Sequence, residues 1–206
     1  MKYLHGTDSL RSVPRDQAIW SVFALCPLLI VVAAAWAFLA VPALYAQNPR
    51  PTDYEVKAAY LYNFGRFVEW PGKVAAAQGG SFTVCVLGQD PFGPSLDATL
   101  AGETIGSKTI VAKRISSVDE SDNCQILFLS LRDDSHLNKI IADLDKKAIL
   151  TVSDMPQFVK RGGMIQFVLE GKKVRFEVNL MATQHAGLTL SSELLKVATA
   201  VRRDTD

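Results

Sequence analysis

Phe82-Thr-Val-Cys-Val-Leu87 is a short, nearly continuous apolar run. Such a run predicts a strand of a sheet that is covered on both faces, because a half-exposed strand alternates apolar and polar residues. Cys124-Gln-Ile-Leu-Phe-Leu129 has the same character and predicts a second, fully buried strand. After the first run, Gly88 turns the chain toward a short helical stretch at residues 94–100. This order of strand, helix and strand favours an α/β fold.

Helical and strand patterns continue to alternate on either side of these two runs. Thr52 predicts a helix start, because Glu55 three residues later completes a capping box, and Pro71 ends that helix. Its apolar stripe is predicted to contain Val56, Tyr60, Phe64, Phe67 and Val68. The other predictions are a helix from Asp133 or Asp134 to Leu144, a turn of helix at 155–160, a helix from Ser191 or Ser192 to Val201, strands at 109–115 and 148–152, and a hairpin of 164–169 and 173–178.

These elements predict one α/β domain. Its core is a mixed, mostly buried β-sheet of about five to six strands with helices on both faces. About 160 residues follow the N-terminal segment, which is enough for a single domain. We expect a signal peptide at 1–46, a short leader at 47–52, the α/β domain at 53–201 and a polar tail at 202–206.

The N-terminal segment has the features of a secretory signal. Lys2, Arg11 and Arg15 precede a stretch without charged side chains from Ala18 to Ala46, and residues 28–40 form its apolar core. Small residues before position 47 offer a cleavage site. The alternative is a retained transmembrane anchor, because the uncharged stretch is long enough to cross a bilayer. Pro27 and Pro42 interrupt that stretch, which favours a cleaved signal helix and a periplasmic protein.

The charges of the chain exclude one class of partner. The whole chain has 22 basic and 21 acidic side chains, of which three basic and two acidic ones precede residue 47. The remaining 19 of each sign form no basic stripe and no charged tail. Nucleic-acid-binding proteins concentrate positive charge on one surface, so nucleic acid is not an expected partner.

Two of the three cysteines lie beyond the signal segment. Cys85 and Cys124 each belong to a predicted buried strand, whereas Cys26 lies in the apolar core of the signal. Thiols in an oxidising compartment are candidates for a disulfide, and neighbouring strands bring Cα atoms within bridging distance. The alternative is a pair of buried free thiols. The spacing matches no metal or redox motif, so neither a metal nor a cofactor is expected.

No combination of residues indicates catalysis. Ser95 lacks the glycine spacing and the preceding strand of a nucleophile elbow, and no histidine partner is evident. His136 and His185 are interpreted as solvated or capping side chains, and Asp133 with Asp134 as helix-capping carboxylates. The sequence therefore predicts a protein that is not an enzyme. The turn at residues 88–93 is a candidate anion cradle, but it lacks a P-loop lysine and the Rossmann glycine spacing.

Two groups of polar residues are candidates for a partner or ligand surface. Asn63, Arg66 and Glu69 stand among aromatic residues at the end of the first helix, and Trp70 beside them is a candidate anchor. The alternative is that Arg66 pairs locally with Glu69 and that the aromatic residues belong to the core. The second group is Arg175, Glu177 and Asn179, which share one face of a predicted strand, with a solvated strand face as the alternative.

The chain resembles the YfiR family. Tyr54-Glu-Val-Lys-Ala-Ala-Tyr-Leu-Tyr-Asn-Phe64, followed by Gly65-Arg-Phe-Val-Glu-Trp-Pro71, is similar to the opening signature of that family. Three later blocks agree, so the resemblance extends from about Asp53 to Ala200 and includes both cysteines. These blocks are 82–88, 124–130, and a C-terminal block made of 162–167, 173–179 and 191–195. Some members have four cysteines in the mature domain, whereas this chain has two.

The resemblance implies an exported regulator of the kind found chiefly in Gram-negative bacteria. Well-described members bind the periplasmic part of an inner-membrane diguanylate cyclase and hold it inactive. Release of that hold, through an outer-membrane lipoprotein or envelope redox stress, raises cyclic-di-GMP and favours biofilm. A homodimer is a further implication. The domain also occurs beside histidine kinases, which leaves a small-molecule sensor for a kinase or transporter as the alternative function.

Overall fold

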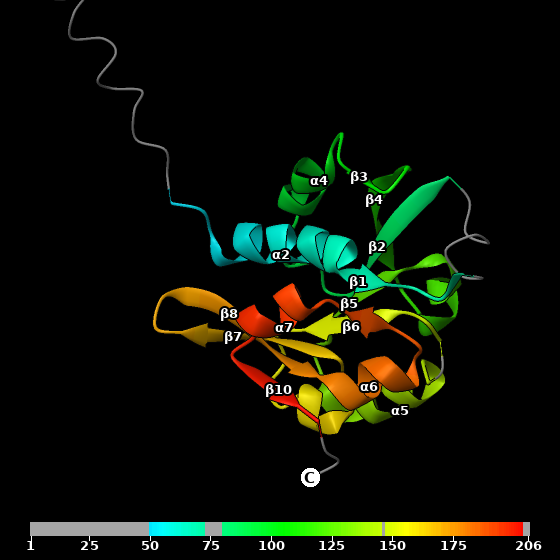
Figure 1. The fold of residues 1–206 in the computed structure, drawn as a ribbon, viewed down its shortest axis with the longest axis vertical. Coiled ribbons are helices and arrows are strands. Elements are labelled where there is room, and N and C mark those ends of the chain that lie inside the picture. Colours follow the sequence, from blue (N-terminus) through cyan, green and yellow to red (C-terminus); the bar gives the residue numbers. More distant parts are fainter. Residues whose placement is uncertain (1–49, 73–79, 146, 204–206) are drawn as a thin grey trace, which may run out of the picture. The chain divides into compact units, whose positions relative to one another are not determined.

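The computed structural model describes residues 50–72, 80–145 and 147–203 (Figure 1). The predicted signal peptide and its alternative, a membrane anchor, lie outside the described residues, as does the start of the predicted leader. From Pro51 onward the chain forms one compact unit.

Among the described residues, eight strands form one mixed sheet in the order β10-β8-β7-β6-β5-β2-β4-β3. Strands β4, β2, β5, β6 and β7 are parallel, β8 and β3 are antiparallel to their neighbours β7 and β4, and β10 is parallel to β8. The bounds are β2 (Ser81–Gly88), β3 (Thr104–Ile105), β4 (Lys108–Ile115), β5 (Ile126–Ser130), β6 (Leu150–Ser153), β7 (Ile165–Glu170), β8 (Lys173–Asn179) and β10 (Ala200–Arg202).

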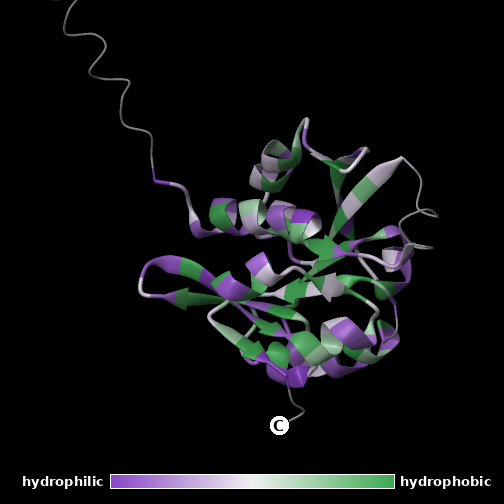
Figure 2. Cartoon of the chain, in the orientation of Figure 1, coloured by the Kyte–Doolittle hydropathy of each residue, from purple (hydrophilic) through white to green (hydrophobic). Residues whose placement is uncertain are grey.

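Helices cover both faces of this sheet. One face packs in a large apolar cluster with α2, α4 and α7, and the other packs with α5 (Figure 1). The helices are α2 (Asp53–Phe67), α4 (Pro94–Leu100), α5 (Leu137–Asp143), α6 (Leu180–His185) and α7 (Ser192–Val197), with 3-10 turns η2 (Val118–Asn123), η3 (Asp134–His136) and η4 (Val159–Arg161). Figure 2 shows the interior strands largely in the hydrophobic colour, which agrees with the buried runs of β2 and β5.

The five parallel strands have the order of a doubly wound flavodoxin-like sheet, 2-1-3-4-5 in chain order. In this arrangement the connections diverge between the first and third parallel strands, which here are β2 and β5. The carboxyl ends of these two strands therefore meet at a topological switch point, where open α/β sheets commonly bind ligands. Gly88 ends β2 there with a φ of 96°, and an added Cβ would collide with the Ser130 carbonyl oxygen.

The predicted α/β class is confirmed, and the first helix begins as predicted. Thr52 caps α2, and its backbone N–H donates to the Glu55 carboxylate at 2.6 Å. The apolar stripe is confirmed in part: Phe64 and Val68 are buried, and Val56, Tyr60 and Phe67 are half-buried against the same apolar cluster. The prediction omitted Ala58 and Leu61, which are fully buried. Lys57 also belongs to the buried face, and a stripe chosen by apolar character alone leaves it out.

The C-terminal helix is shorter than predicted. Ser191 caps it as expected, because its hydroxyl accepts a hydrogen bond from the Leu194 N–H. The helix ends at Val197 rather than Val201, because Ala200–Arg202 pairs with the edge of β8 as strand β10. Several short elements were also not predicted. These are α6, β3, η2, and a small two-stranded sheet in which β1 (Val68–Glu69) pairs with β9 (Thr189–Leu190).

Candidate functional site

Asn63 and Arg66 lie on the part of α2 that faces away from the core. The Asn63 amide nitrogen donates to the Ala59 carbonyl at 2.9 Å, one turn earlier in the helix. The Arg66 guanidinium lies 5.8 Å from the ring centre of Tyr62 and 6.0 Å from that of Phe67. Arg66 therefore covers aromatic carbon with its positive group while its side chain stays exposed.

Glu69 ends the short strand β1, and Trp70 follows it. Glu69 is exposed, whereas the Trp70 indole is half-buried and meets the Phe82 ring edge-on at 5.1 Å. The Trp70 Nε1 is buried and has no hydrogen-bond partner among the described residues. An unsatisfied indole N–H in a packed position is uncommon in proteins, so this group is the unusual feature of the first candidate surface.

The second candidate surface lies on β8. Arg175 is exposed, and its Nε is 3.8 Å from a carboxylate oxygen of Glu170 across the hairpin. Glu177 is half-buried. Asn179 has a structural role, because its amide nitrogen donates to the Val159 carbonyl and its side-chain oxygen caps α6 by accepting from the Ala182 N–H.

The structure places the two candidate surfaces on opposite faces of the sheet. Phe176, which alternates with Arg175 and Glu177 along β8, is fully buried against Phe64 of α2, with ring centres 5.2 Å apart. Side chains of successive strand residues point to opposite faces. The Arg175 row therefore faces away from α2, and the two groups do not combine into one site.

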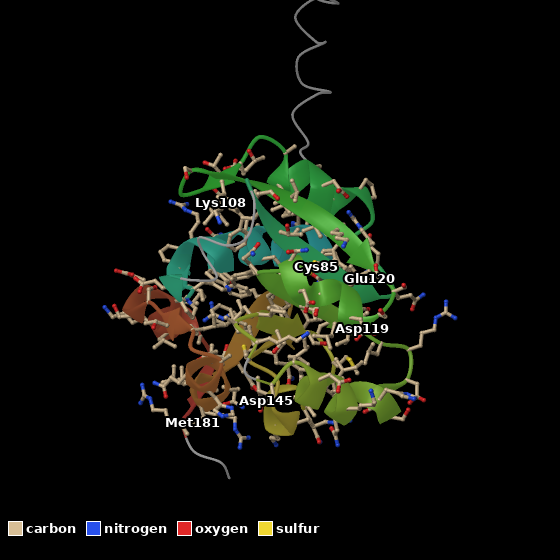
Figure 3. The ribbon with its side chains drawn as sticks, turned by 90° about the vertical axis from the view of Figure 1, so that its right-hand side faces the viewer. Cys85, Lys108, Asp119, Glu120, Asp145 and Met181 are labelled. Carbon is tan, nitrogen blue, oxygen red and sulfur yellow. A yellow bond between two sulfur atoms is a disulfide. The ribbon has the colours of Figure 1, made fainter. Side chains whose placement is uncertain are left out.

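Cys85 and Cys124 form a disulfide, with Cα atoms 5.8 Å apart. Cys85 lies in β2, and Cys124 caps the end of η2, two residues before the neighbouring strand β5 begins. The side chains are 0 % and 1 % exposed, and they pack in the second apolar cluster with Leu127 and Phe158. Figure 3 shows Cys85 in the interior, beside the η2 segment that bears Asp119 and Glu120. A solvent-borne reductant has no direct access to these sulfur atoms.

The turn at residues 88–93 already uses its own backbone amides. The Asp90 carboxylate accepts from the N–H groups of Phe92 and Gly93, and the Gln89 N–H donates to the Ser130 carbonyl. Arg114 of β4 then donates to Asp90 at 2.9 Å. These contacts already occupy the backbone N–H groups that an anion would need, so the turn offers few free hydrogen-bond donors to an anion.

Arg114 also connects β4 to α4. Its guanidinium donates to Asp97 of α4 and to the Gly93 carbonyl, both at 2.8 Å. The hydrogen bond from Arg114 lowers the pKa of the Asp97 carboxyl. These hydrogen bonds fix the turn between β2 and α4, so Arg114 has a structural role.

A groove of about 430 Å³ opens at the switch point between β2 and β5. It presents the Gln89 amide, the Arg132 guanidinium and the His136 imidazole to solvent. The full lining is Gly88, Gln89, Ser130, Leu131, Arg132, Asp133 and His136. The location agrees with the general rule for open α/β sheets, and the residues offer hydrogen-bond donors without a deep apolar floor.

Ser135 and His136 do not form a catalytic pair. The Ser135 hydroxyl donates to Asp133, and it lies 2.9 Å from Nδ1 of His136. A serine nucleophile needs a histidine base that a third group orients, whereas here the serine stands between the other two groups in an exposed turn. Asp133 is a capping carboxylate, as predicted, because it accepts from the Ser135 N–H, which lowers its pKa.

Lys57, Asp154 and Tyr54 form a buried polar cluster that sequence reasoning missed. The Lys57 ammonium is 2.6 Å from the Asp154 carboxylate, and the lysine is only 6 % exposed. The Tyr54 hydroxyl donates to the same carboxylate at 3.0 Å, and the ammonium lies 4.1 Å from the Tyr54 ring centre. Burial, followed by the charge of Asp154, raises the pKa of Tyr54 to about 12. The only signal in the sequence was a lysine among the apolar residues of a helix.

The described residues contain no group of three or more histidine, cysteine or acidic side chains placed to hold a metal ion. Among the helices of residues 50–72, 80–145 and 147–203, none combines the length and hydropathy that a bilayer span requires.

Two solved structures are similar to parts of this chain. One is an ABC domain from Streptococcus pneumoniae in complex with L-Trp, with 12% identity, a TM-score of 0.44, and coverage of 59% of this chain and 55% of that chain. The other is a conserved domain protein from Vibrio cholerae O1 biovar El Tor, with 11% identity, a TM-score of 0.44, and coverage of 73% and 60%. The chain spans less than two thirds of either protein.

A family comparison covers most of the described domain. The model of the family described as YfiR/HmsC-like matches residues 54–199. This range begins in the first turn of α2 and ends just before β10, so it includes both cysteines, the β7–β8 hairpin and both candidate surfaces. The chain therefore belongs to the YfiR/HmsC-like family.

Proposed function

We propose that this protein is a periplasmic regulator that binds the periplasmic part of an inner-membrane diguanylate cyclase and holds the cyclase inactive. The observation that carries the proposal is the family match over residues 54–199, because this family is regulatory and periplasmic. The buried Cys85–Cys124 disulfide adds support, since disulfides persist in oxidising compartments such as the periplasm.

Repression of this kind needs only a modest binding preference. A ligand shifts a two-state equilibrium by as much as its affinities for the two states differ. A tenfold reduction of the active cyclase corresponds to a preference of about 1.4 kcal/mol for the inactive state. This figure is only the difference between the affinities for the two states, and the whole interface has to supply the affinity for the inactive state itself.

The decisive measurement is intracellular cyclic-di-GMP in a strain that lacks the gene. We expect the level to rise on deletion and to fall again when the full chain is restored. A form without residues 2–46 is the matched control, because it makes the same domain without the predicted signal. Restoration by both forms, or no rise on deletion, would contradict a periplasmic repressor.

Charge reversal at each candidate surface tests where the partner binds. Arg66→Glu alters the α2 surface and Arg175→Glu alters the β8 surface, and both side chains are exposed. Lys139→Glu is the control, because Lys139 is 77 % exposed on α5 and its ion pair joins it only to Asp143 of the same helix. We expect one of the two test variants to lose repression at normal protein level. Full repression by both would remove Arg66 and Arg175 from the binding surface.

A second candidate function is a periplasmic small-molecule sensor that serves a histidine kinase or a transporter. The groove at the switch point favours it, because Arg132 and His136 there face solvent beside the ends of β2 and β5. Calorimetric titration with small anions and nucleotides should then show saturable binding that Arg132→Ala weakens. Absence of heat across the set would leave only the partner-binding proposal.

A further inference from the structure

A cleft of about 230 Å³ separates α5 from α6, on the side of the molecule away from the switch-point groove. Figure 1 shows the two helices side by side, and Figure 3 labels Asp145, two residues beyond the end of α5, and Met181 on α6. The cleft shares no residue with either candidate surface. Its lining consists of Ile141, Leu144, Asp145, Thr151, Gly162, Met164, Ala182, His185 and Ala186.

The inner wall of the cleft is apolar and closed. Leu144, Met164 and Ala186 are 4 %, 7 % and 7 % exposed, so they form a floor rather than an open surface. Thr151 is the polar residue of the floor, and its hydroxyl already accepts a hydrogen bond from the Met164 N–H at 3.1 Å. The floor therefore offers an occupant mainly apolar contact, with one hydroxyl that already accepts a hydrogen bond.

The mouth of the cleft is polar. His185 at the end of α6 lies 3.1 Å, through Nδ1, from a carboxylate oxygen of Asp145 just beyond the end of α5. The two side chains are 62 % and 48 % exposed, so solvent and solutes reach them. Apolar walls with a few polar groups at one side are the usual composition of small-molecule sites.

Gly162 keeps the cleft open. Its φ of 97° is one that side-chain-bearing residues rarely adopt, and an added Cβ would lie 3.1 Å from Cγ2 of Ile141. The glycine thus prevents any side chain from filling the space between α5 and the loop before β7. A cavity of roughly 150 Å³ is large enough for benzene, so about 230 Å³ accepts one substituted ring.

We infer that this cleft, named here the α5–α6 cleft, binds a small, uncharged single-ring compound that carries a hydrogen-bond donor. The ring lies against Leu144, Met164 and Ala186, and the donor reaches the Asp145 carboxylate at the mouth. The negative charge of Asp145 disfavours anionic ligands, because their charge would lie beside the carboxylate.

The position of α6 connects the cleft to the regulatory surfaces, and this step rests on the proposed function. Asn179, the last residue of the β8 row, caps α6 at its start. Beyond its end, Gly187 packs so closely on Pro71 that an added Cβ would lie 3.3 Å from the proline ring. A ligand that moves α6 would therefore act on the ends of both β8 and β1, and so on repression.

Binding is tested on the purified protein with phenol, which has one ring and one donor, by saturation-transfer NMR and calorimetry. We expect saturable binding that Ala182→Leu abolishes by filling the cleft. Ala142→Leu, on the exposed side of α5, is the matched control and should bind normally. Asp145→Ala should weaken the binding of phenol about tenfold, as expected for loss of a hydrogen bond to a charged group. The same variant should bind toluene as the wild type does. Benzoate should bind far more weakly than phenol.

Three results would overturn the inference. These are no saturable binding of phenol or toluene, equal phenol binding by wild type and a folded Ala182→Leu variant, or equal binding of phenol and benzoate. Asp145→Ala supplies an independent test if Ala182→Leu fails to fold, because Asp145 lies at the exposed rim. In cells, we expect repression by Ala182→Leu to differ from that by Ala142→Leu. If the two variants repress equally while the wild type binds phenol, the cleft is a binding site but α6 does not connect it to repression.

Discussion

At the scale of single residues, the ion pair between Lys57 and Asp154 is a contact whose loss should be costly to the fold. Moving a lysine ammonium out of water costs several kcal/mol unless a partner compensates for the lost hydration. Asp154 compensates from the end of β6, and the Tyr54 hydroxyl satisfies the same carboxylate. The cluster thereby attaches the first helix to the carboxyl edge of the sheet.

Removal of the anion should therefore cost more than removal of the cation. We expect Asp154→Ala to lower the free energy of unfolding by about 3 kcal/mol, because it leaves Lys57 charged, buried and unpaired. Lys57→Met should cost less, because Asp154 is 23 % exposed and keeps its hydrogen bond from Tyr54. Urea unfolding of the two variants measures the difference. Lys139→Ala, which breaks an exposed pair on α5, is the control and should cost under about 1 kcal/mol. Equal losses for Asp154→Ala and Lys57→Met would contradict this account.

Tyr54 gives the cluster a dependence on alkaline pH. Its pKa is raised to about 12 in the folded protein from an ordinary value of 10.0. A folded-state pKa above the unfolded one means that the stabilisation is complete below pH 10 and disappears as the pH rises toward 12. The midpoint of urea unfolding should therefore fall over this range more steeply in the wild type than in Tyr54→Phe. Parallel curves for the two proteins would show that Tyr54 titrates normally.

At the scale of elements, the disulfide joins β2 to the residue that caps η2 just before β5, and β2 and β5 are already neighbours in the sheet. The two cysteines are 39 residues apart in sequence, and the closed loop contains α4, β3, β4 and η2. The bridge therefore restrains the unfolded chain far more than it alters the folded one. Because both side chains are within 1 % of full burial, the bond is a structural one that a reductant reaches only when the sheet opens.

Replacement of both cysteines should lower stability without changing the fold. In the loop-entropy model, Cys85→Ala with Cys124→Ala costs up to about 4 kcal/mol. Chemical unfolding, with circular dichroism of the native state as the check on fold, measures the loss. The wild-type disulfide should resist dithiothreitol in buffer and yield to it in urea, in step with unfolding. Rapid reduction of the native protein would instead indicate a redox-sensing bond, and a double variant of unchanged stability would contradict the structural role.

At the scale of the whole molecule, the predicted features are those that local sequence determines. The apolar run 82–87 and the capping box of Thr52 need no distant partner to be identified. Ala200–Arg202 forms a strand only because the edge of β8 is beside it, and α6 starts where Asn179 caps it. The last helix was predicted to continue to Val201, because the sequence alone does not show that β8 lies beside residues 200–202.

In the candidate site, too, local patterns could be predicted from the sequence and contacts between distant residues could not. Periodicity placed Arg175 and Glu177 on the face opposite Phe176, and the structure agrees. The pairing of Lys57 with Asp154, 97 residues away, depends on the strand order, which local patterns do not contain. The partner-surface role of Arg66, Glu69, Trp70 and the β8 row remains a prediction.

The domain should unfold as one unit, since a single sheet connects its elements from β10 to β3. Trp70 is the only tryptophan after residue 46, and it packs on Phe82 at the start of β2. In a form without residues 1–46, its fluorescence reports on that region, whereas circular dichroism reports on all helices and strands. We expect the two signals to change together in urea. Separate transitions would show that α2 and β1 detach before the sheet opens.

The place of β2 in the sheet has a consequence for the order in which the chain is synthesised. This first long strand lies between β4 and β5, so both its neighbours emerge from the ribosome after it. Until residue 130 has emerged, β2 lacks one flank, and the nascent polypeptide cannot close a stable core. The central position of β2 therefore makes formation of the sheet depend on strands synthesised later, and folding of this domain starts later in synthesis than that of a domain whose first two strands pair with each other.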